Sequence, residues 1–230
     1  MIIGVPKEIK LNESRVSLVP SGVDELVKMG HKVYIENNAG LGSGFTNEMY
    51  ENSGAAILST PKEVFSQSDM IIKVKEPQQE EFSLIKPNQI IFTYFHFAAD
   101  KYLLEAMLES KAVSIAYETV ESNGKLPLLI PMSEVAGRLA VINGSKCLES
   151  NMGGKGKLIS GVPGVESATV SIIGGGVVGS NAAKLAAGLG AKVNILDVDM
   201  DRLRYLDDFM PRNVQTLYSN NHNINSVLYE

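Results

Sequence analysis

Short apolar runs alternate with amphipathic stretches along most of the chain. The apolar runs have the length and the β-branched or aromatic content of buried strands, and they lie at residues 2–5, 33–35, 55–58, 70–74, 90–95 and 113–116. Helical spacing marks the stretches between them. One such stretch runs from Pro20 to Gly30, with Ser21 as its predicted N-cap and Gly30 as its predicted C′ residue. This alternation predicts a parallel sheet with crossover helices.

A longer helical pattern runs from Met132 to Met152 and leads into a segment rich in glycine and proline, residues 153–167. That segment lacks the spacing of a P-loop, so an interdomain turn is favoured over a phosphate-binding loop. Strand and helix patterns resume at Thr169. We therefore predict an α/β protein with two Rossmann-like parallel-sheet units: an N-terminal domain at 1–130, a linking helix and linker at 131–168, and an incomplete dinucleotide-binding unit at 169–230.

The second unit holds only three predicted strands, half of the usual six. In the usual strand order 3-2-1-4-5-6, the run at 169–173 is then an apolar edge strand. Exposed apolar edges pair readily with other chains. We therefore expect a marginally stable protein that self-associates unless another chain covers that edge.

Gly174, Gly176 and Gly179 form the pattern Gly-x-Gly-x-x-Gly directly after an apolar run. The first glycine permits the tight turn, the second admits a pyrophosphate close to the backbone, and the third lets helix and strand pack closely. A helix N-terminus would then face the phosphates. Because a predicted strand and helix flank the pattern, dinucleotide binding is favoured over a purely structural glycine turn.

Asp197 ends the next predicted strand, at the distance where an acid meets the ribose 2′-hydroxyl of a bound dinucleotide. A carboxylate there repels a 2′-phosphate, so the sequence favours NAD over NADP. Arg202 and Arg204 are near enough to weaken this preference slightly.

Four polar groups stand where strands of the first unit end. Arg15 follows the first strand, Lys75 and His96 end the fourth and fifth, and Glu118 follows the sixth. Ligands of parallel sheets bind at the carboxyl ends of the strands, so we expect these groups at one edge of one sheet. Two cations suit a substrate carboxylate. A histidine more often has a structural role, but this setting favours His96 as a proton carrier.

Composition and charge exclude several classes of function and structure. The chain has 230 residues and a net charge of −5 with interspersed signs, which argues against a nucleic-acid surface. Its single cysteine, Cys147, excludes an internal disulfide and is expected to be a packing residue. We see no signal peptide and no apolar run long enough to span a bilayer, so a cytoplasmic protein is expected. No metal site is predicted.

Over its whole length, the sequence resembles the L-alanine dehydrogenases. The matching segments are GVPKEIKLNESRVSLVPSGVDELVKMGH, AGLGSGF, KVKEP, FTYFHFAAD, IAYETV, LPLLIPMSEVAGRLA, SGVPGV, GGGVVGSNAAKLAAGLGA and RLRYLDD. The family is similar to the NAD-binding domain of proton-translocating transhydrogenases. There, other residue types usually take the places of Lys75 and His96, so the dehydrogenase branch is favoured over a transhydrogenase subunit.

The resemblance implies reversible, NAD-dependent oxidative deamination of L-alanine to pyruvate and ammonia. It implies that Arg15, Lys75 and Met132 bind the substrate. It also implies that His96, with Lys75 and Glu118, carries the catalysis. The residues implied to bind NAD are Ser133, Gly174, Gly175, Gly176, Val177, Val178, Gly179, Asp197, Arg202 and Ser219. Members of this family are commonly homohexamers.

Family members continue well past residue 230, and the further segment completes the nucleotide domain around the nicotinamide. We therefore expect a C-terminally truncated chain. The alternative to a working dehydrogenase is a non-catalytic remnant that keeps nucleotide binding or pairs with an intact homologue.

Overall fold

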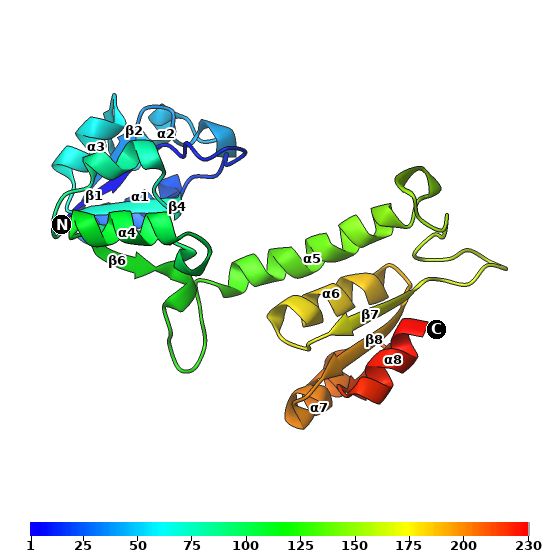
Figure 1. Cartoon of the computed structure of the whole chain (residues 1–230). Helices are drawn as coiled ribbons and strands as arrows, with labels where there is room; N and C mark the ends of the chain where they lie inside the picture. Colours follow the sequence, from blue (N-terminus) through cyan, green and yellow to red (C-terminus); the bar gives the residue numbers. More distant parts are fainter. Residues whose placement is uncertain (230) are drawn as a thin grey trace. The chain divides into compact units, whose positions relative to one another are not determined.

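The structure, a computed structural model, describes residues 1–229 and falls into two compact units, Met1–Leu126 and a second that begins at Pro127 (Figure 1). Helix α5 (Ile130–Cys147) belongs to the second unit. The predicted linking helix and linker at 131–168 therefore lie within that unit.

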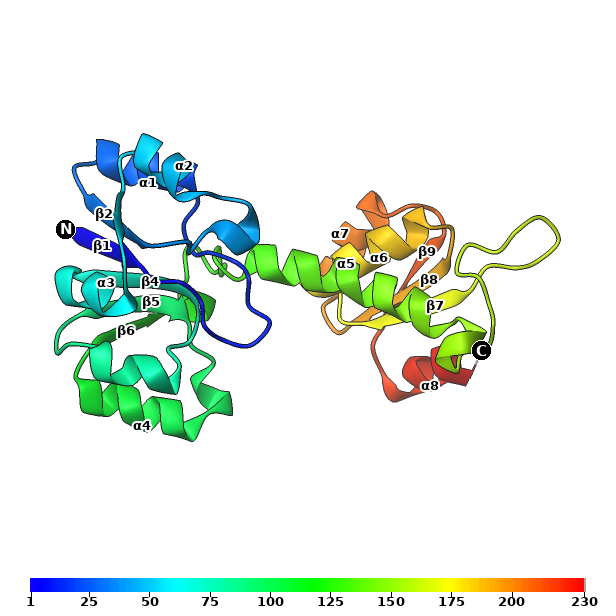
Figure 2. The same ribbon diagram turned by 90° about the horizontal axis from the view of Figure 1, so that it is seen from above.

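Six parallel strands form the sheet of the first unit. They are β1 (Ile2–Val5), β2 (Lys32–Glu36), β3 (Ala56–Leu58), β4 (Met70–Lys75), β5 (Ile90–Tyr94) and β6 (Val113–Ala116). Their order across the sheet is β3-β2-β1-β4-β5-β6, and Figure 2 shows β2, β1, β4, β5 and β6 following one another in this sequence. All six apolar runs predicted as strands are strands, so the predicted parallel α/β fold is confirmed.

Helices cover both faces of this sheet. They are α1 (Pro20–Lys28), α2 (Asn47–Asn52), α3 (Pro61–Gln67) and α4 (Lys101–Ser110). The 3-10 helices are η1 (Leu41–Ser43), η2 (Gln79–Leu84), η3 (Phe97–Ala99) and η4 (Tyr117–Thr119). Residues of α3 and α4 share one buried cluster with Ile71 of β4, and residues of α1 and α2 share another with Ile72. Adjacent residues of β4 thus face opposite layers, as strand alternation requires.

The N-cap of helix α1 lies two residues earlier than predicted. Pro20 is its first residue and Val19 its N-cap, so the prediction of Ser21 as the cap is wrong. Proline suits this position because its missing N–H has no partner in the first turn anyway. Gly30 has φ 83°, as a C′ residue requires.

Three parallel strands form the sheet of the second unit, in the order β7-β8-β9. The strands are β7 (Thr169–Ile173), β8 (Lys192–Asp197) and β9 (Val214–Tyr218), and the helices are α5, α6 (Val177–Gly188), α7 (Met200–Phe209) and α8 (Asn221–Tyr229), with a 3-10 turn η5 (Ser150–Met152). Its buried core joins α5, α6 and α7 to β8 and is rich in alanine, which lets the helices lie close to the sheet.

Helices α5 and α6 pack at very short range (Figure 1). A β-carbon at Gly137 of α5 would lie 2.2 Å from the carbonyl oxygen of Val178. Helix α5 starts before the predicted Met132 and ends at Cys147 rather than Met152. Cys147 is exposed, so its prediction as a packing residue is wrong.

Strand β7 pairs only with β8 among the described residues, so it is the predicted edge strand. An apolar groove of about 690 Å³ runs beside it, lined by residues of α5, β7 and the start of α6. Association of the chain through this edge stays a prediction. We expect light scattering to find a concentration-dependent mass above that of one chain; a monodisperse monomer with a high melting temperature would contradict it.

Candidate functional site

The four predicted polar groups of the first unit follow four neighbouring strands. Arg15 lies in the loop after β1, Lys75 is the last residue of β4, His96 comes two residues after β5, and Glu118 lies in η4, just after β6. Strands β1, β4, β5 and β6 are consecutive in the sheet and parallel. The carboxyl ends of the strands therefore bring these residues to the same edge.

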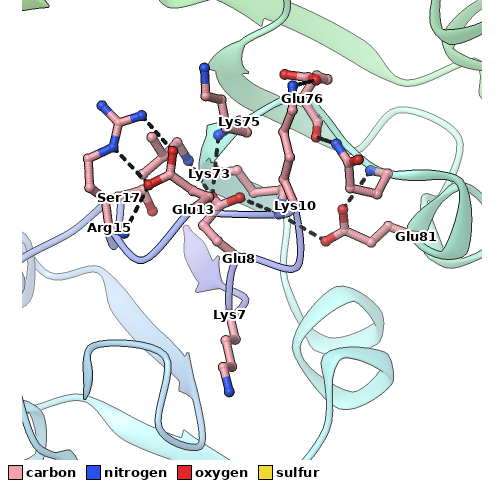
Figure 3. Close-up of polar contacts among 12 residues, drawn as sticks. Lys7, Glu8, Lys10, Glu13, Arg15, Ser17, Lys73, Lys75, Glu76 and Glu81 are labelled. Carbon is pink, nitrogen blue, oxygen red and sulfur yellow. Dashed lines mark hydrogen bonds and ion pairs between the residues drawn. The ribbon is translucent and has the colours of Figure 1, made fainter. Parts of the chain in front are cut away.

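Arg15 is bound to Glu13, a residue that the sequence reasoning did not single out. The guanidinium Nε donates to Oε1 of Glu13 at 2.8 Å and Nη2 donates to Oε2 at 2.5 Å (Figure 3). The backbone N–H of Arg15 also donates to Oε1 of Glu13, at 2.9 Å. This double contact fixes the plane of the guanidinium, which is 43% exposed as a side chain and so remains accessible from solvent.

The hydrogen bonds from Arg15 lower the pKa of Glu13 from its ordinary 4.5 to about 2, and the charge of Lys75 contributes in the same direction. Glu13 therefore lies in the fields of both cations proposed for the substrate carboxylate. The same hydrogen bonds raise the pKa of Arg15.

Glu13 should make stability depend on pH. A carboxyl whose pKa is lowered by folding stabilises the fold above its unfolded pKa of 4.5, and this stability is lost as pH falls toward about 2. We expect Glu13→Gln to be less stable than the parent at neutral pH and to lose less stability on acidification. Because Arg15 is 43% exposed, solvent screening reduces the effect. Urea unfolding at a series of pH values checks this; parallel pH profiles for the two proteins would contradict it.

His96 has an uncommon backbone conformation. Its φ of 53° and ψ of 38° place it in the left-handed region, which costs a non-glycine residue about 1–2 kcal/mol. Its backbone N–H donates to Oε1 of Glu118 at 2.7 Å, and its ring stacks on Tyr94 with centroids 6.3 Å apart. The strained conformation turns an exposed imidazole out of the strand end and holds it there.

Glu118 thus contacts the backbone of His96. Its other carboxylate oxygen, Oε2, is buried and has no hydrogen-bond partner among the described residues. Burial raises the pKa of Tyr94, the charge of Arg15 opposes that shift, and the charge of Glu118 adds to it. Tyr94 is therefore within electrostatic reach of both Arg15 and Glu118.

A small cavity of about 310 Å³ opens beside Arg15. Its lining comes from the loops after β1 and β2 and includes Glu8, Glu13, Arg15 and Asn38. Lys75, His96 and Glu118 do not line this cavity. Of the four predicted groups, this cavity therefore reaches Arg15 alone.

In the second unit, the glycine loop joins β7 to α6 as predicted. Gly174 has φ 103°, which only glycine adopts readily, and it makes the turn out of β7. A β-carbon at Gly179 would lie 1.8 Å from the carbonyl oxygen of Gly174, so this glycine lets helix and strand approach. A β-carbon at Gly176 would meet nothing within 4 Å, so the space above this residue is open to a ligand.

Asp197 closes β8 beside the loop. Its Oδ2 accepts the N–H of Gly175 at 2.5 Å and its Oδ1 accepts the N–H of Asp199 at 2.9 Å. Hydrogen bonding from Asp199, then from Gly175, lowers the pKa of Asp197. The group is therefore an anion at neutral pH, as hydrogen bonding to ribose hydroxyls requires.

Arg202 holds the loop from the other side. Its Nε donates to the carbonyl oxygen of Gly175 at 2.6 Å, its Nη2 donates to the hydroxyl of Ser180 at 3.1 Å, and its guanidinium carbon lies 5.0 Å from the centre of the Tyr205 ring. The sequence did not suggest this contact with the loop backbone.

The remaining predicted residues of the second unit lie on nearby elements. Val177 and Val178 open α6, and Ser219 follows β9 and donates its N–H to the carbonyl oxygen of Asp197 at 2.9 Å. Ser133 lies one turn before Gly137 on α5, the residue that contacts the start of α6. Met132 precedes it on the same helix. These residues fit a dinucleotide: a turn with open space, a helix N-terminus and an anionic carboxylate at the next strand end.

Three glycine substitutions in this loop and helix should have different outcomes. We expect Gly176→Ala to fold normally but to weaken NAD binding, because its methyl group would occupy the pyrophosphate position. Gly179→Ala should lower stability as well, because it collides with the Gly174 carbonyl. Gly188→Ala, the control in the same helix, meets nothing within 4 Å and should stabilise the chain by up to about 1 kcal/mol.

Urea unfolding and NAD titration of the three variants check this ranking. Equal NAD affinities for Gly176→Ala and Gly188→Ala would contradict the proposed position of the pyrophosphate.

Among residues 1–229, no group of three or more His, Cys, Asp or Glu side chains could hold a metal ion. In the same part of the chain, none of the helices combines the length and apolar character needed to cross a bilayer.

Comparison with known protein families matches both units. Residues 4–136 match the family model "Alanine dehydrogenase/PNT, N-terminal domain", and residues 140–230 match "Alanine dehydrogenase/PNT, C-terminal domain". The chain belongs to the alanine dehydrogenase/PNT family. This confirms the family that the sequence resembles.

Individual members of the alanine dehydrogenase/PNT family show the degree of similarity. The alanine dehydrogenase of Methanococcus maripaludis is 58% identical over 97% of this chain, and that of Bacillus subtilis is 54% identical over 100%. A solved L-alanine dehydrogenase superposes with a TM-score of 0.93 at 48% identity, covering 100% of this chain and 64% of that one. A transhydrogenase from Sinorhizobium meliloti, at 23% identity and a TM-score of 0.76 over 94% of this chain and 64% of that one, shares the fold.

The chain spans only part of these alanine dehydrogenases. It covers 60% of the Methanococcus maripaludis protein and 61% of the Bacillus subtilis protein.

Proposed function

We propose that the chain takes part in NAD-dependent oxidative deamination of L-alanine, in which L-alanine, water and NAD⁺ give pyruvate, ammonium, NADH and a proton. The observation that supports this most directly is the edge of the first sheet, where Arg15, Lys75, His96 and Glu118 follow neighbouring strands. The identity of 50% or more to alanine dehydrogenases supports the choice of substrate.

The two cations of this edge would bind the substrate carboxylate. Arg15 is aligned by Glu13, and a guanidinium can hold a carboxylate through two parallel hydrogen bonds. Lys75 adds a compact positive charge that suits the carbonyl oxygen of pyruvate. Met132 of α5 would contact the small side chain of the substrate.

His96 would move the proton. Deamination adds water to the imine carbon, and a base must take up the proton that this water loses. The exposed imidazole has two ring nitrogens, one of which can accept this proton and later release it. Glu118 would act through the backbone of His96, which it holds in the left-handed conformation.

NAD would be held by the second unit. The glycine loop of residues 174–179 would contact the pyrophosphate, and Asp197 the ribose, with Ser133, Arg202 and Ser219 around them. When bound, NAD supplies the acceptor for the hydride that leaves the α-carbon of the amino acid. The carboxylate of Asp197 favours NAD over NADP.

Pyruvate binding tests the role of the first unit. We expect calorimetric titration to show binding to the parent chain and an affinity roughly 10–100-fold lower for Arg15→Met, because two charge-assisted hydrogen bonds are lost. Arg204→Met is the matched control, since Arg204 pairs with Asp201 on the exposed surface of α7. No pyruvate binding by the parent, or equal binding by Arg15→Met, would reject the proposal.

A second candidate is nucleotide binding without turnover. The glycine loop favours it, because the turn at Gly174, the open space above Gly176 and the anionic Asp197 fit a dinucleotide whether or not a substrate binds. NAD binding without NADH formation separates this candidate from the first.

Assembly into a homo-oligomer and a cytoplasmic location belong to the proposal as well.

A further inference from the structure

A fully buried lysine lies two residues before Lys75 on β4. The side chain of Lys73 is 0% exposed, and its ammonium lies 3.2 Å from Oε2 of Glu8 and 3.0 Å from Oε1 of Glu81 (Figure 3). The two carboxylate side chains are each 3% exposed. Burying three charges is costly, and an apolar trio of similar size is often as stable or more stable. Stability alone therefore does not explain why these three charged side chains are buried together.

Strand β4 has an irregularity at this point. Ile72 pairs with Phe92 and Lys75 pairs with Tyr94, so three steps along β4 match two along β5. This extra residue is a β-bulge, which removes backbone groups from the regular ladder. Glu8 binds two of those groups: its Oε1 accepts the N–H of Val74 at 2.6 Å and that of Lys75 at 3.4 Å.

The bulge decides where Lys75 lies. In an unbroken strand, residues two apart share a face, so Lys75 would follow Lys73 into the buried layer. One extra residue reverses the alternation. Figure 3 shows the result: the Lys75 side chain points away from the Glu8–Lys73–Glu81 cluster.

The same cluster also holds the chain after Lys75. Oε2 of Glu81 accepts the backbone N–H of Gln78 at 2.8 Å, at the start of η2. Lys73 thus ties together one carboxylate that binds the bulge before Lys75 and another that binds the turn after it.

We propose that Glu8, held by Lys73 and Glu81, is a positioning residue that fixes the bulge of β4 and thereby directs the Lys75 amine to the substrate. This inference rests on the proposed function only for the identity of the ligand, a small carboxylic acid. Glu8 itself acts through hydrogen bonds to the backbone.

The first measurement is amide hydrogen exchange in the full chain, which needs no ligand. Glu8→Asp keeps the charge that Lys73 requires but shortens the side chain, so its carboxylate withdraws from the bulge. We expect the amides of Val74 and Lys75 to exchange at least roughly tenfold faster in this variant. The control is Asp69→Glu, a one-methylene change at a carboxylate that accepts the N–H of Ile2 at 2.7 Å at the opposite end of β4.

The second measurement separates positioning from simple stabilisation. We expect Glu8→Asp to weaken pyruvate binding roughly tenfold, and to change it less than about twofold when Lys75→Ala is already present. If Glu8 had a purely structural role, Glu8→Asp would lower stability equally in the parent and in Lys75→Ala. It would also weaken pyruvate binding by the same factor in both. Glu81→Gln is a second variant in case Glu8→Asp does not fold. We expect it to weaken pyruvate binding less than Glu8→Asp does, and this effect should likewise depend on the presence of Lys75.

The outcomes are distinct. Unchanged exchange at Val74 and Lys75, or a loss of pyruvate affinity that persists in full without Lys75, would overturn the positioning role. A parent chain that binds no pyruvate would instead reject the proposed function. In that case hydrogen exchange at Val74 and Lys75 would be the deciding measurement for the positioning role. Faster exchange of these amides in Glu8→Asp would support it.

Discussion

Replacing His96 by glutamine should reduce NADH formation from L-alanine by about 10²–10⁴-fold, the usual contribution of a general acid or base. Glutamine keeps the size and a hydrogen-bonding end but cannot carry the proton at neutral pH. The backbone N–H that binds Glu118 is unaffected, so the left-handed conformation should be retained. Affinities for NAD and pyruvate should therefore change little.

Steady-state kinetics with calorimetric titration of both ligands check this, and His222→Gln is the matched control. His222 lies exposed on α8 and no chemistry is assigned to it. If His96→Gln and His222→Gln turned over L-alanine at the same rate, His96 would not be the proton carrier.

Replacing Lys73 by methionine should lower the free energy of unfolding by about 3–5 kcal/mol, the usual result of removing one partner from a buried ion pair. Methionine fills most of the space, but Glu8 and Glu81 are left facing each other without the cation. Burial already raises the pKa of Glu8, and the charge of Lys73 is the largest influence that opposes it.

Urea unfolding measures this loss, with Lys28→Met as its control. Lys28 carries the same side chain and also pairs with two acids, Asp24 and Glu25, but on the exposed surface of α1. Exposed pairs contribute little, so the control should unfold almost as the parent does. Similar unfolding curves for the two variants would show that the Lys73 cluster does not behave as a buried charge network.

Much of the fold follows from the spacing of apolar runs. Each strand of the first sheet coincides with such a run, and the crossover rule alone brings Arg15, Lys75, His96 and Glu118 to one edge. The glycine spacing likewise predicts the turn at Gly174, because few other residues adopt that φ.

Other features depend on contacts between distant segments. The pairing of Arg15 with Glu13 is a local choice of side-chain rotamer that periodicity does not report. The bulge of β4 depends on Glu8, 65 residues from Lys73 in the sequence. One signal was present: a lysine inside an apolar strand, at position 73, requires buried acidic partners. The spacing of residues in the sequence does not show that Glu8 and Glu81 are these partners.

The most direct test is the absorbance of NADH on mixing the chain with NAD and L-alanine. The proposal predicts NADH formation that depends on L-alanine, falls at least about 100-fold in His96→Gln, is weakened in Arg15→Met and is unchanged in His222→Gln. NAD binding with no NADH formed by the parent chain, at any concentration of L-alanine, would contradict it.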